Sequence, residues 1–380
     1  MTFSGEDSRL LLNRAASLAA ASELDVLPNP PVGCVIVDPA GRVVGEGFHR
    51  YYGDPHAEAA ALARAGDAAR GATAFLTLEP CGGGPGKKTP PCAPALHAAG
   101  VAAVVYACPD PSAPAAGSGP SLLRAAGVDV GIFPCPEAEA LLSRWRRALA
   151  DPFPWTIAKW AITLDGKSAD VRGGSRWISG EESRARVHAL RARVDAVVVG
   201  ARTAALDDPD LRPRSGTGPG GRLPLRVVVD GGLRLPAEWK LASTAREGPV
   251  LVATGVRAGA GRRAALEARG VEVRAYPGAE GRVDLAALFR DLKARGAHRV
   301  LLEGGGELCA AALRAGLVRQ AAVFVAPTIL GGRGAPGPVG GDEGLRMAAN
   351  PLRLEDVRVD RLGADLLVEG IAPVEGFARI

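Results

Sequence analysis

The first 150 residues alternate between segments with helical spacing of apolar residues and short continuous apolar runs. The helical spacing predicts helices over 10–21, 56–65 and 93–99. The continuous runs predict strands over 33–37, 74–78 and 101–107. Helices that alternate with short strands are typical of a three-layer α/β domain.

The residues after 150 repeat this alternation with a longer series of strands. Candidate strands lie at 155–164, 196–200, 225–230, 250–253, 271–275, 299–303, 322–326 and 365–369. Candidate helices lie at 181–193, 262–268 and 285–295. Stretches rich in Gly and Pro at 212–222 and 331–344 are expected to be loops. The pattern predicts a second α/β domain around a mixed sheet.

A break in both patterns separates the two halves. The segment Asp151-Pro152-Phe153-Pro154 favours neither helix nor strand. A chain of 380 residues is also long for a single core. We therefore expect two domains, residues 1–150 and residues 151–380.

Composition narrows the class of protein. Hydrophobic residues make up 47% of the chain and charged residues 23%, which is ordinary for a soluble globular protein. Six cysteines form no dense framework, so a reducing cytoplasm is expected rather than secretion. The N-terminus lacks the pattern of a signal peptide, and no apolar run reaches membrane-spanning length. The net charge of +5 favours an anionic ligand only mildly.

One imidazole and two thiols stand at a spacing that predicts a zinc site. His56 lies in Pro-His-Ala-Glu, Cys81 in Leu-Glu-Pro-Cys and Cys92 in Pro-Pro-Cys. Three protein ligands leave a fourth position open for water, which distinguishes a catalytic zinc from a structural one. Glu58 follows His56 by two residues and is expected to carry protons. A His-x-Glu motif followed by Pro-Cys is the signature of zinc-dependent nucleobase deaminases.

The second half of this signature is irregular. The usual motif is Pro-Cys-x-x-Cys, whereas ten residues separate Cys81 from Cys92. Pro90-Pro91 stiffens the return of this long loop, and Cys92 then opens a predicted helix, whose N-terminus favours a thiolate. The alternative is that both cysteines are small core residues and His56 is a surface residue.

A glycine run in the second half suggests a phosphate site. The predicted strand that ends at Glu303 runs into Gly304-Gly305-Gly306, and a helix begins at Glu307. Glycines and a helix N-terminus admit a phosphate, although a tight turn without a ligand fits the run equally well. The run lacks the Gly-x-Gly-x-x-Gly pattern, so a Rossmann domain is not indicated.

Motifs in both halves follow one another in a recognisable order. Those of the first half are Pro28-Asn29-Pro30-Pro31-Val32-Gly33, His56-Ala57-Glu58, Leu78-Glu79-Pro80-Cys81 and Thr89-Pro90-Pro91-Cys92. Those of the second half are Lys159-Trp160-Ala161-Ile162-Thr163-Leu164-Asp165-Gly166, Ser175-Arg176-Trp177-Ile178-Ser179, Thr203 through Asp207-Asp208-Pro209, and Ile329-Leu330-Gly331-Gly332. Together they resemble the bifunctional riboflavin-biosynthesis deaminase/reductase family, over nearly the whole chain.

For the first half, the resemblance implies a cytidine-deaminase-like three-layer domain. Its small-molecule substrate would be 2,5-diamino-6-(5-phosphoribosylamino)pyrimidin-4-one, whose ring amine leaves as ammonia. His56, Cys81 and Cys92 would bind Zn²⁺. Glu58 would be the catalytic proton shuttle, and Asn29 would help to hold the pyrimidine.

For the second half, the resemblance implies a dihydrofolate-reductase-like domain that passes hydride from NADPH to the ribose C1 and leaves a ribityl chain. The residues implied to line the NADPH site are Ala161, Trp177, Thr203, Asp207, Gly231, Gly305, Gly306 and Glu307. The residues implied to hold the substrate are Lys159, Ser175, Arg191, Leu211, Arg214 and Glu303. Arg191 and Arg214 are the expected partners of its phosphate. The family also implies a homo-oligomer, a dimer or tetramer, with no nucleic-acid or membrane partner.

The chain departs from the family's pattern around the zinc loop. The family's loop reads Cys-Ser-His-x-Gly-x-Thr-Pro-Pro-Cys, whereas residues 82–89 have glycines in place of Ser and His and are two residues longer. Downstream, Ser112 stands where the family's Asp-Pro-Asn-Pro has its asparagine. We still expect an active deaminase, because the three zinc ligands and Glu58 are retained.

Two other functions remain as alternatives. A deaminase that acts on RNA needs aromatic residues interleaved with basic ones, and aromatic residues make up only 4% of this chain. The second alternative is a deaminase whose reductase-like half is degenerate or regulatory. Taken without the resemblance, Arg191 also fits a solvated helix face, Trp177 a core position and Asp207 a turn.

Overall fold

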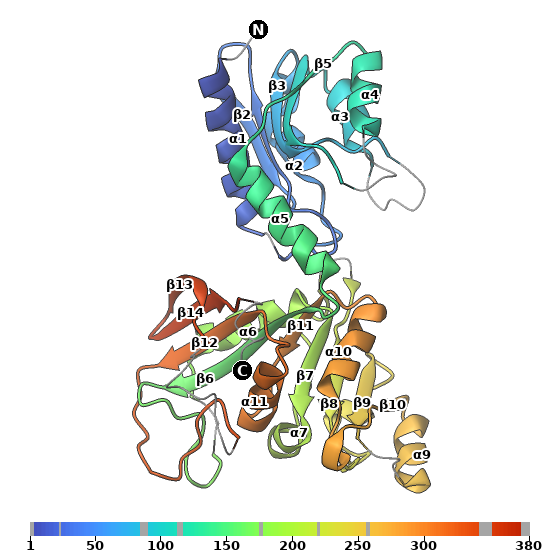
Figure 1. The fold of residues 1–380 in the computed structure, drawn as a ribbon, viewed down its shortest axis with the longest axis vertical. Coiled ribbons are helices and arrows are strands. Elements are labelled where there is room, and N and C mark those ends of the chain that lie inside the picture. Colours follow the sequence, from blue (N-terminus) through green and yellow to red (C-terminus); the bar gives the residue numbers. More distant parts are fainter. Residues whose placement is uncertain are drawn as a thin grey trace. The chain divides into compact units, whose positions relative to one another are not determined.

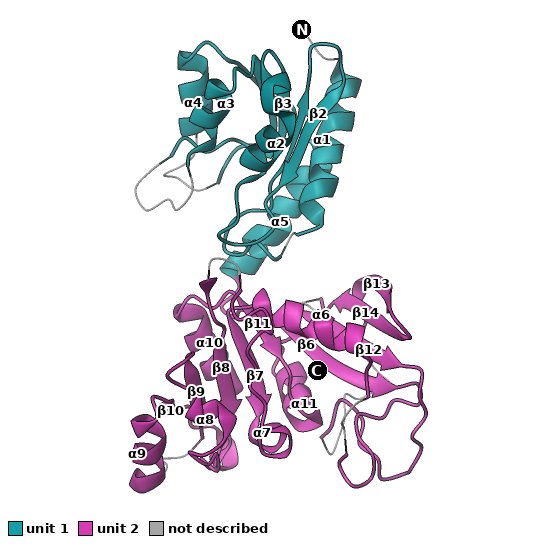
Figure 2. Cartoon of the chain, turned by 180° about the vertical axis from the view of Figure 1, so that it is seen from behind, with its two compact units in different colours: residues 1–150 teal, residues 151–380 magenta. Residues whose placement is uncertain are grey.

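In the computed structural model the chain divides into two compact units, residues 1–150 and residues 151–380 (Figure 1, Figure 2). The structure describes residues 4–22, 24–83, 90–111, 117–174, 178–218, 221–255, 259–341 and 352–373. Among these residues, no helix is both long and apolar enough to cross a membrane.

A five-stranded sheet in the order β2-β1-β3-β4-β5 forms the middle layer of the first unit. Its strands are β1 (Gly33–Val37), β2 (Val43–Phe48), β3 (Thr73–Leu78), β4 (Ala103–Cys108) and β5 (Asp129–Ile132). The helices are α1 (Gly5–Ala20), α2 (Ala57–Ala65), α3 (Cys92–Ala98), α4 (Ser118–Ala125) and α5 (Pro136–Ala150). β1 lies antiparallel to β2 and β3, whereas β3, β4 and β5 run parallel.

Helices cover both faces of this sheet. Cys34 and Ile36 of β1 share a buried cluster with Ala57 and Ala61 of α2, while α1 packs on β1, β3 and α5. Because both faces are covered, β1 and β3 are buried at every position. The expected three-layer α/β fold is confirmed.

Strand β2 was not predicted, because Gly45 and Gly47 interrupt its apolar run. Because these glycines have no side chain, the backbone of α2 can lie close to β2. A Cβ on Gly47 would lie 2.3 Å from the carbonyl oxygen of Ala57, and one on Gly45 would lie 2.4 Å from that of Ala61. The close approach holds α2, and therefore His56 and Glu58 at its N-terminus, directly against the sheet.

A nine-stranded sheet in the order β10-β9-β8-β7-β11-β6-β12-β14-β13 forms the second unit. Its strands are β6 (Trp155–Thr163), β7 (Ala196–Gly200), β8 (Leu225–Val229), β9 (Val250–Thr254), β10 (Glu272–Ala275), β11 (Arg299–Leu302), β12 (Gln320–Ala326), β13 (Glu355–Leu362) and β14 (Asp365–Ile371). The strands from β10 to β12 run parallel, and β14 and β13 complete the sheet antiparallel. The expected mixed α/β sheet is confirmed.

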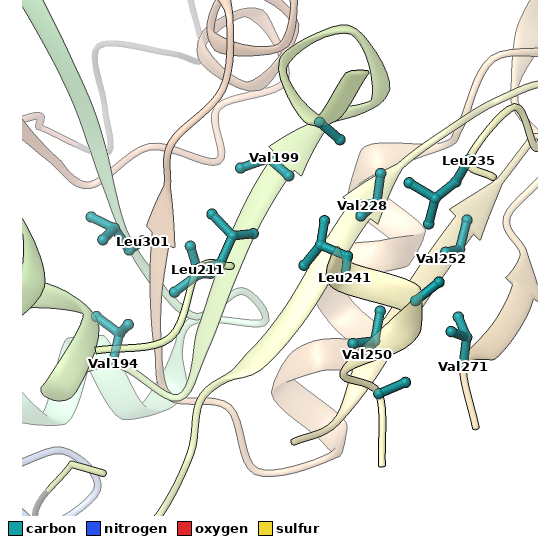
Figure 3. Packing of buried hydrophobic residues seen from close by; sticks show 14 of the residues in the cluster. Val194, Val199, Leu211, Val228, Leu235, Leu241, Val250, Val252, Val271 and Leu301 are labelled. Atoms are coloured by element: carbon teal, nitrogen blue, oxygen red, sulfur yellow. The ribbon is translucent and has the colours of Figure 1, made fainter. Parts of the chain in front are cut away.

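Two apolar cores lie on the opposite faces of this sheet. Its helices are α6 (Glu181–Ala192), α7 (Ala201–Asp207), α8 (Lys240–Ser243), α9 (Ala260–Ala268), α10 (Leu285–Ala294) and α11 (Gly306–Arg314). One core joins Val199, Val228 and Val252 to Leu241 of α8 (Figure 3). Leu190 of α6 belongs to the same core. The other core packs against α10 and α11. The parallel strands β7, β11 and β6 are neighbours, so the residues at their carboxyl ends gather at one edge.

Candidate active sites

The structure brings His56, Cys81 and Cys92 together. The Nδ1 atom of His56 lies 3.2 Å from Sγ of Cys92 and 3.9 Å from Sγ of Cys81. The three ligand atoms all lie within 4.8 Å of one another, and no other such group of possible metal ligands occurs among the described residues. The set of one imidazole and two thiols suits a zinc ion with one open position.

Each ligand is placed by the end of a regular element. His56 is the N-cap of α2 rather than part of its first turn, where the sequence had suggested it. Cys81 follows β3 by three residues, and Cys92 is the first residue of α3. The backbone N–H of Ala93 donates to the carbonyl of Cys81 at 3.0 Å, which closes the zinc loop at its base.

The electrostatics of this cluster favour a cation. The Cys92 thiol has its pKa raised, chiefly by its hydrogen bond to Cys81 and by burial, with Glu58 adding to the effect. The pKa of Glu58, which is 3% exposed, is raised by burial. Burial disfavours the anions of both the Cys92 thiol and the Glu58 carboxyl, and Glu58 further raises the pKa of Cys92. A divalent cation among them removes that conflict, so the residues fit zinc.

Asn29 lies near this cluster through His49, a residue that the sequence analysis did not identify. Nδ2 of Asn29 is 3.1 Å from Nε2 of His49, and Nδ1 of His49 is 3.0 Å from the carbonyl oxygen of Pro55. The rings of His49 and His56 meet edge to face with their centroids 5.4 Å apart. No motif signals His49, because Asn29 precedes it by 20 positions and Pro55 and His56 follow it on the segment between β2 and α2.

A second cluster, in the second unit, centres on the carboxylate of Glu303. Lys159 on β6 places its Nζ 3.0 Å from Oε2. Arg191 on α6 donates from Nε to Oε1 at 2.6 Å and from Nη2 to Oε2 at 3.0 Å. These two cations hold the pKa of Glu303 well below its usual range although the residue is buried. Three residues implied by the resemblance therefore form one ion-paired group, which we call the Glu303 triad.

Two more of the expected substrate residues, Leu211 and Arg214, lie outside the Glu303 triad. Arg214 is exposed and Leu211 is buried with a φ of +63°. Burial lowers the pKa of His188, and the charges of Arg191 and Arg214 lower it further, so both arginines lie near His188. The bidentate pair of Arg191 with Glu303 leaves Arg214 as the cation more open to a phosphate.

The described residues among those expected at the NADPH site lie on or directly after β8, β7, β11 and β6. A Cβ on Gly305 would lie 3.2 Å from Oγ1 of Thr203, so this glycine allows the starts of α7 and α11 to meet. Asp207 ends α7, Gly231 follows β8 by two residues, and Ala161 lies on β6. Gly305, Thr203 and Asp207 are thereby brought to one edge of the sheet.

Two of the expected cofactor residues have partners within the chain. The carbonyl of Gly306 accepts from the N–H of Gly340, and Oε1 of Glu307 accepts from the N–H of Gly341, each at 3.0 Å. These bonds fasten the loop after β12 to the start of α11. Ser175 and Trp177 lie outside the described residues, as do residues 84–89 of the zinc loop and Ser112.

Two family models match the chain. The model described as "Cytidine and deoxycytidylate deaminase zinc-binding region" matches residues 6–108, and that of the RibD C-terminal domain matches residues 154–368. The first match includes all three candidate zinc ligands, and the second includes the Glu303 triad.

Relatives and solved structures match over most of their length. Riboflavin biosynthesis protein RibD from Actinobacillus pleuropneumoniae is 36% identical over 94% of this chain and 93% of its own. The protein of that name from Mycobacterium tuberculosis strain H37Rv is 38% identical over 91% of each chain. The structure of Acinetobacter baumannii RibD has a TM-score of 0.72 at 34% identity and covers 97% of this chain and 100% of its own.

A solved structure from Thermotoga maritima has a more explicit title. It is a diaminohydroxyphosphoribosylaminopyrimidine deaminase/5-amino-6-(5-phosphoribosylamino)uracil reductase, 31% identical with a TM-score of 0.68 over 97% of this chain and 99% of its own. Fold, zinc-ligand set and both family models agree with it. The chain therefore belongs to the RibD family of bifunctional riboflavin-biosynthesis enzymes, with a deaminase domain followed by a reductase domain.

Proposed function

We propose that residues 1–150 remove the ring amine of 2,5-diamino-6-(5-phosphoribosylamino)pyrimidin-4-one as ammonia, and that residues 151–380 then reduce the ribosyl chain of the product to ribityl. Zn²⁺ and NADPH are the cofactors of the two steps. The observation that carries the proposal is the gathering of His56, Cys81 and Cys92 beside the buried Glu58.

In the deaminase half, His56, Cys81 and Cys92 hold the zinc. A bound Zn²⁺ supplies Lewis-acid activation of a water molecule near neutral pH. Glu58 takes a proton from the attacking water and returns one to the departing amine. Burial raises the pKa of Glu58 above its ordinary value, and a general acid and base must both accept and donate a proton.

Asn29 presents its carbonyl oxygen to the pyrimidine. The Pro55 carbonyl can only accept, so Nδ1 of His49 carries the hydrogen and Nε2 accepts from the amide of Asn29. The Asn29 amide group is thereby committed, and its Oδ1 remains to accept from an N–H of the substrate. Burial lowers the pKa of His49, which keeps the ring in this neutral form.

In the reductase half, the Glu303 triad holds the sugar while NADPH supplies the hydride. Glu303 keeps Lys159 and Arg191 in fixed positions, and the ammonium of Lys159 retains donors for a sugar oxygen. We assign to Lys159 the proton that the ring oxygen needs when the ribose opens. Arg214 meets the phosphate of the substrate.

The comparisons also bear on the alternative of a degenerate reductase half. The RibD C-terminal domain model matches residues 154–368, and Lys159, Arg191 and Glu303 are all present and paired. Nothing supports the alternative.

We further propose that the enzyme acts in the cytoplasm as a homo-oligomer. None of the six cysteines forms a disulfide, and Cys81 and Cys92 must stay reduced to bind zinc. The homo-oligomer is an expectation from the family, and sedimentation of the purified chain would measure it.

The variant Glu58→Gln tests the assignment of the deaminase step. We expect ammonia release to fall by about 10²- to 10⁴-fold, because the proton shuttle is lost. The same protein should still bind zinc and still oxidise NADPH when it receives the deaminated pyrimidine. Ammonia release at the wild-type rate would contradict the role of Glu58.

A further inference from the structure

A buried carboxylate lies close in the sequence to the zinc ligand Cys81 and has no role in the proposed deamination. Glu79 is 5% exposed and lies two residues before Cys81. Its backbone N–H donates to the carbonyl of Cys108, which extends the pairing of β3 with β4. Its side chain points to the start of α4, where Oε1 accepts from the N–H of Gly117 at 2.7 Å.

This hydrogen bond joins the two ends of one loop. The backbone N–H groups of Gly117 and Asp110 both donate to the carboxyl group of Glu79. Gly117 is the N-cap of α4 and has a φ of +72°, a conformation that favours glycine. The carboxylate therefore fixes where α4 begins relative to the end of β4.

The start of α4 in turn lies against the backbone that carries Cys81. A Cβ on Gly119 would lie 1.7 Å from the carbonyl oxygen of Pro80, and one on Gly82 would lie 2.7 Å from Oγ of Ser118. Only glycines permit this approach. The turn from Pro80 to Gly82 thus rests on the first residues of α4, and Glu79 holds those residues in place.

We propose that Glu79 is a positioning residue for the deaminase, an inference that rests on the proposed zinc site. It acts through Gly117 and Gly119 to set the position of the Cys81 thiolate. Outer partners of this kind typically change metal affinity or activity by about 10- to 100-fold when they are removed. A role limited to stability would leave the affinity of the folded protein for zinc unchanged.

The test compares Glu79→Ala and Glu79→Gln with the wild type as full-length chains. Zn²⁺ affinity is measured by competition with a chromophoric chelator, and the absorption spectrum of the Co²⁺-loaded protein reports the geometry of the thiolates. Glu46→Ala is the matched control, because Glu46 pairs with Arg14 in the same unit.

We expect Glu79→Ala to bind Zn²⁺ about 10- to 100-fold more weakly and to shift the Co²⁺ spectrum. Glu79→Gln keeps an acceptor for Gly117 and should restore part of the affinity, and Glu46→Ala should match the wild type. If Glu79→Ala does not fold, Glu79→Asp replaces it, with a loss in the same direction.

A Glu79→Ala or Glu79→Asp protein with wild-type Zn²⁺ affinity and an unchanged Co²⁺ spectrum would overturn the proposal. Failure of the wild type itself to bind Zn²⁺ would instead overturn the zinc site on which the proposal rests.

Discussion

At the scale of single residues, the two halves of the enzyme handle buried charge in opposite ways. Burial raises the pKa of Glu58, and His56 only partly opposes that rise. Glu303 lies between Lys159 and Arg191, and its pKa falls. The first carboxyl is suited to exchange protons, and the second to remain an anion that positions two cations.

The variant Glu303→Gln tests the role of this anion. Removing the charge leaves Lys159 and Arg191 as neighbouring cations without their partner. We expect a loss of about 3 kcal/mol in the free energy of unfolding of the second unit, since both cations are partly exposed. Reductase activity should be lost and ammonia release retained. Denaturant unfolding measures the stability, and assays of NADPH oxidation and ammonia release measure the two activities. A Glu303→Gln protein as stable as the wild type and with an active reductase would contradict the prediction.

The low pKa of Glu303 also predicts how stability depends on pH. Because the folded-state pKa lies below the unfolded value of about 4.3, the contribution of this group is fully present above that value. It is lost only as the pH falls further, towards the folded-state pKa. Wild type and Glu303→Gln should therefore differ in stability at pH 7 and converge at strongly acidic pH. A difference that stays constant down to that range would count against the ion pairs.

At the scale of elements, close approach of backbones places the zinc ligands. Gly45 and Gly47 bring α2 onto β2, and Gly119 brings α4 onto Pro80. The ligands themselves sit at a helix N-cap, after a strand and at a helix start. Small shifts of these elements move the ligands with them.

The variant Gly47→Val tests this packing. Its side chain would meet the Ala57 carbonyl and displace the start of α2, where His56 and Glu58 lie. We expect weaker Zn²⁺ binding and loss of ammonia release. NADPH oxidation should be retained when the deaminated pyrimidine is supplied. Gly131→Ala is the control, because a Cβ there meets nothing within 4 Å. Wild-type Zn²⁺ affinity in Gly47→Val would show that α2 does not depend on this contact.

Only part of the fold and of the candidate sites could be predicted from the sequence alone. The zinc site was predictable because the ligand types and the neighbouring Glu58 carry the chemistry in short motifs. Strand β2 was missed because its glycines serve packing rather than strand propensity. The Glu303 triad was expected only through the resemblance, since Arg191 and Glu303 lie 112 positions apart and pair through the tertiary fold. His49 carries no motif of its own. Glu79 lies in the Leu-Glu-Pro-Cys motif, but its hydrogen bond with Gly117, 38 positions away, depends on the tertiary fold.

At the scale of the whole molecule, one chain combines two units with separate chemistry. The zinc ligands and Glu58 all lie within residues 1–150, and the Glu303 triad lies within residues 151–380. Each cluster is complete in its own unit. Loss of one activity should therefore leave the other, provided that its own substrate is supplied.

The most direct test of this account is a coupled assay on the zinc-loaded, full-length chain. The diaminopyrimidine substrate and NADPH are added, and ammonia release and NADPH oxidation are followed with and without a chelator. We predict that both signals appear and that the chelator stops both, whereas NADPH oxidation with the deaminated pyrimidine survives the chelator. Ammonia release that persists after the chelator has removed zinc would contradict the account. So would a chelator that stops NADPH oxidation when the deaminated pyrimidine is supplied.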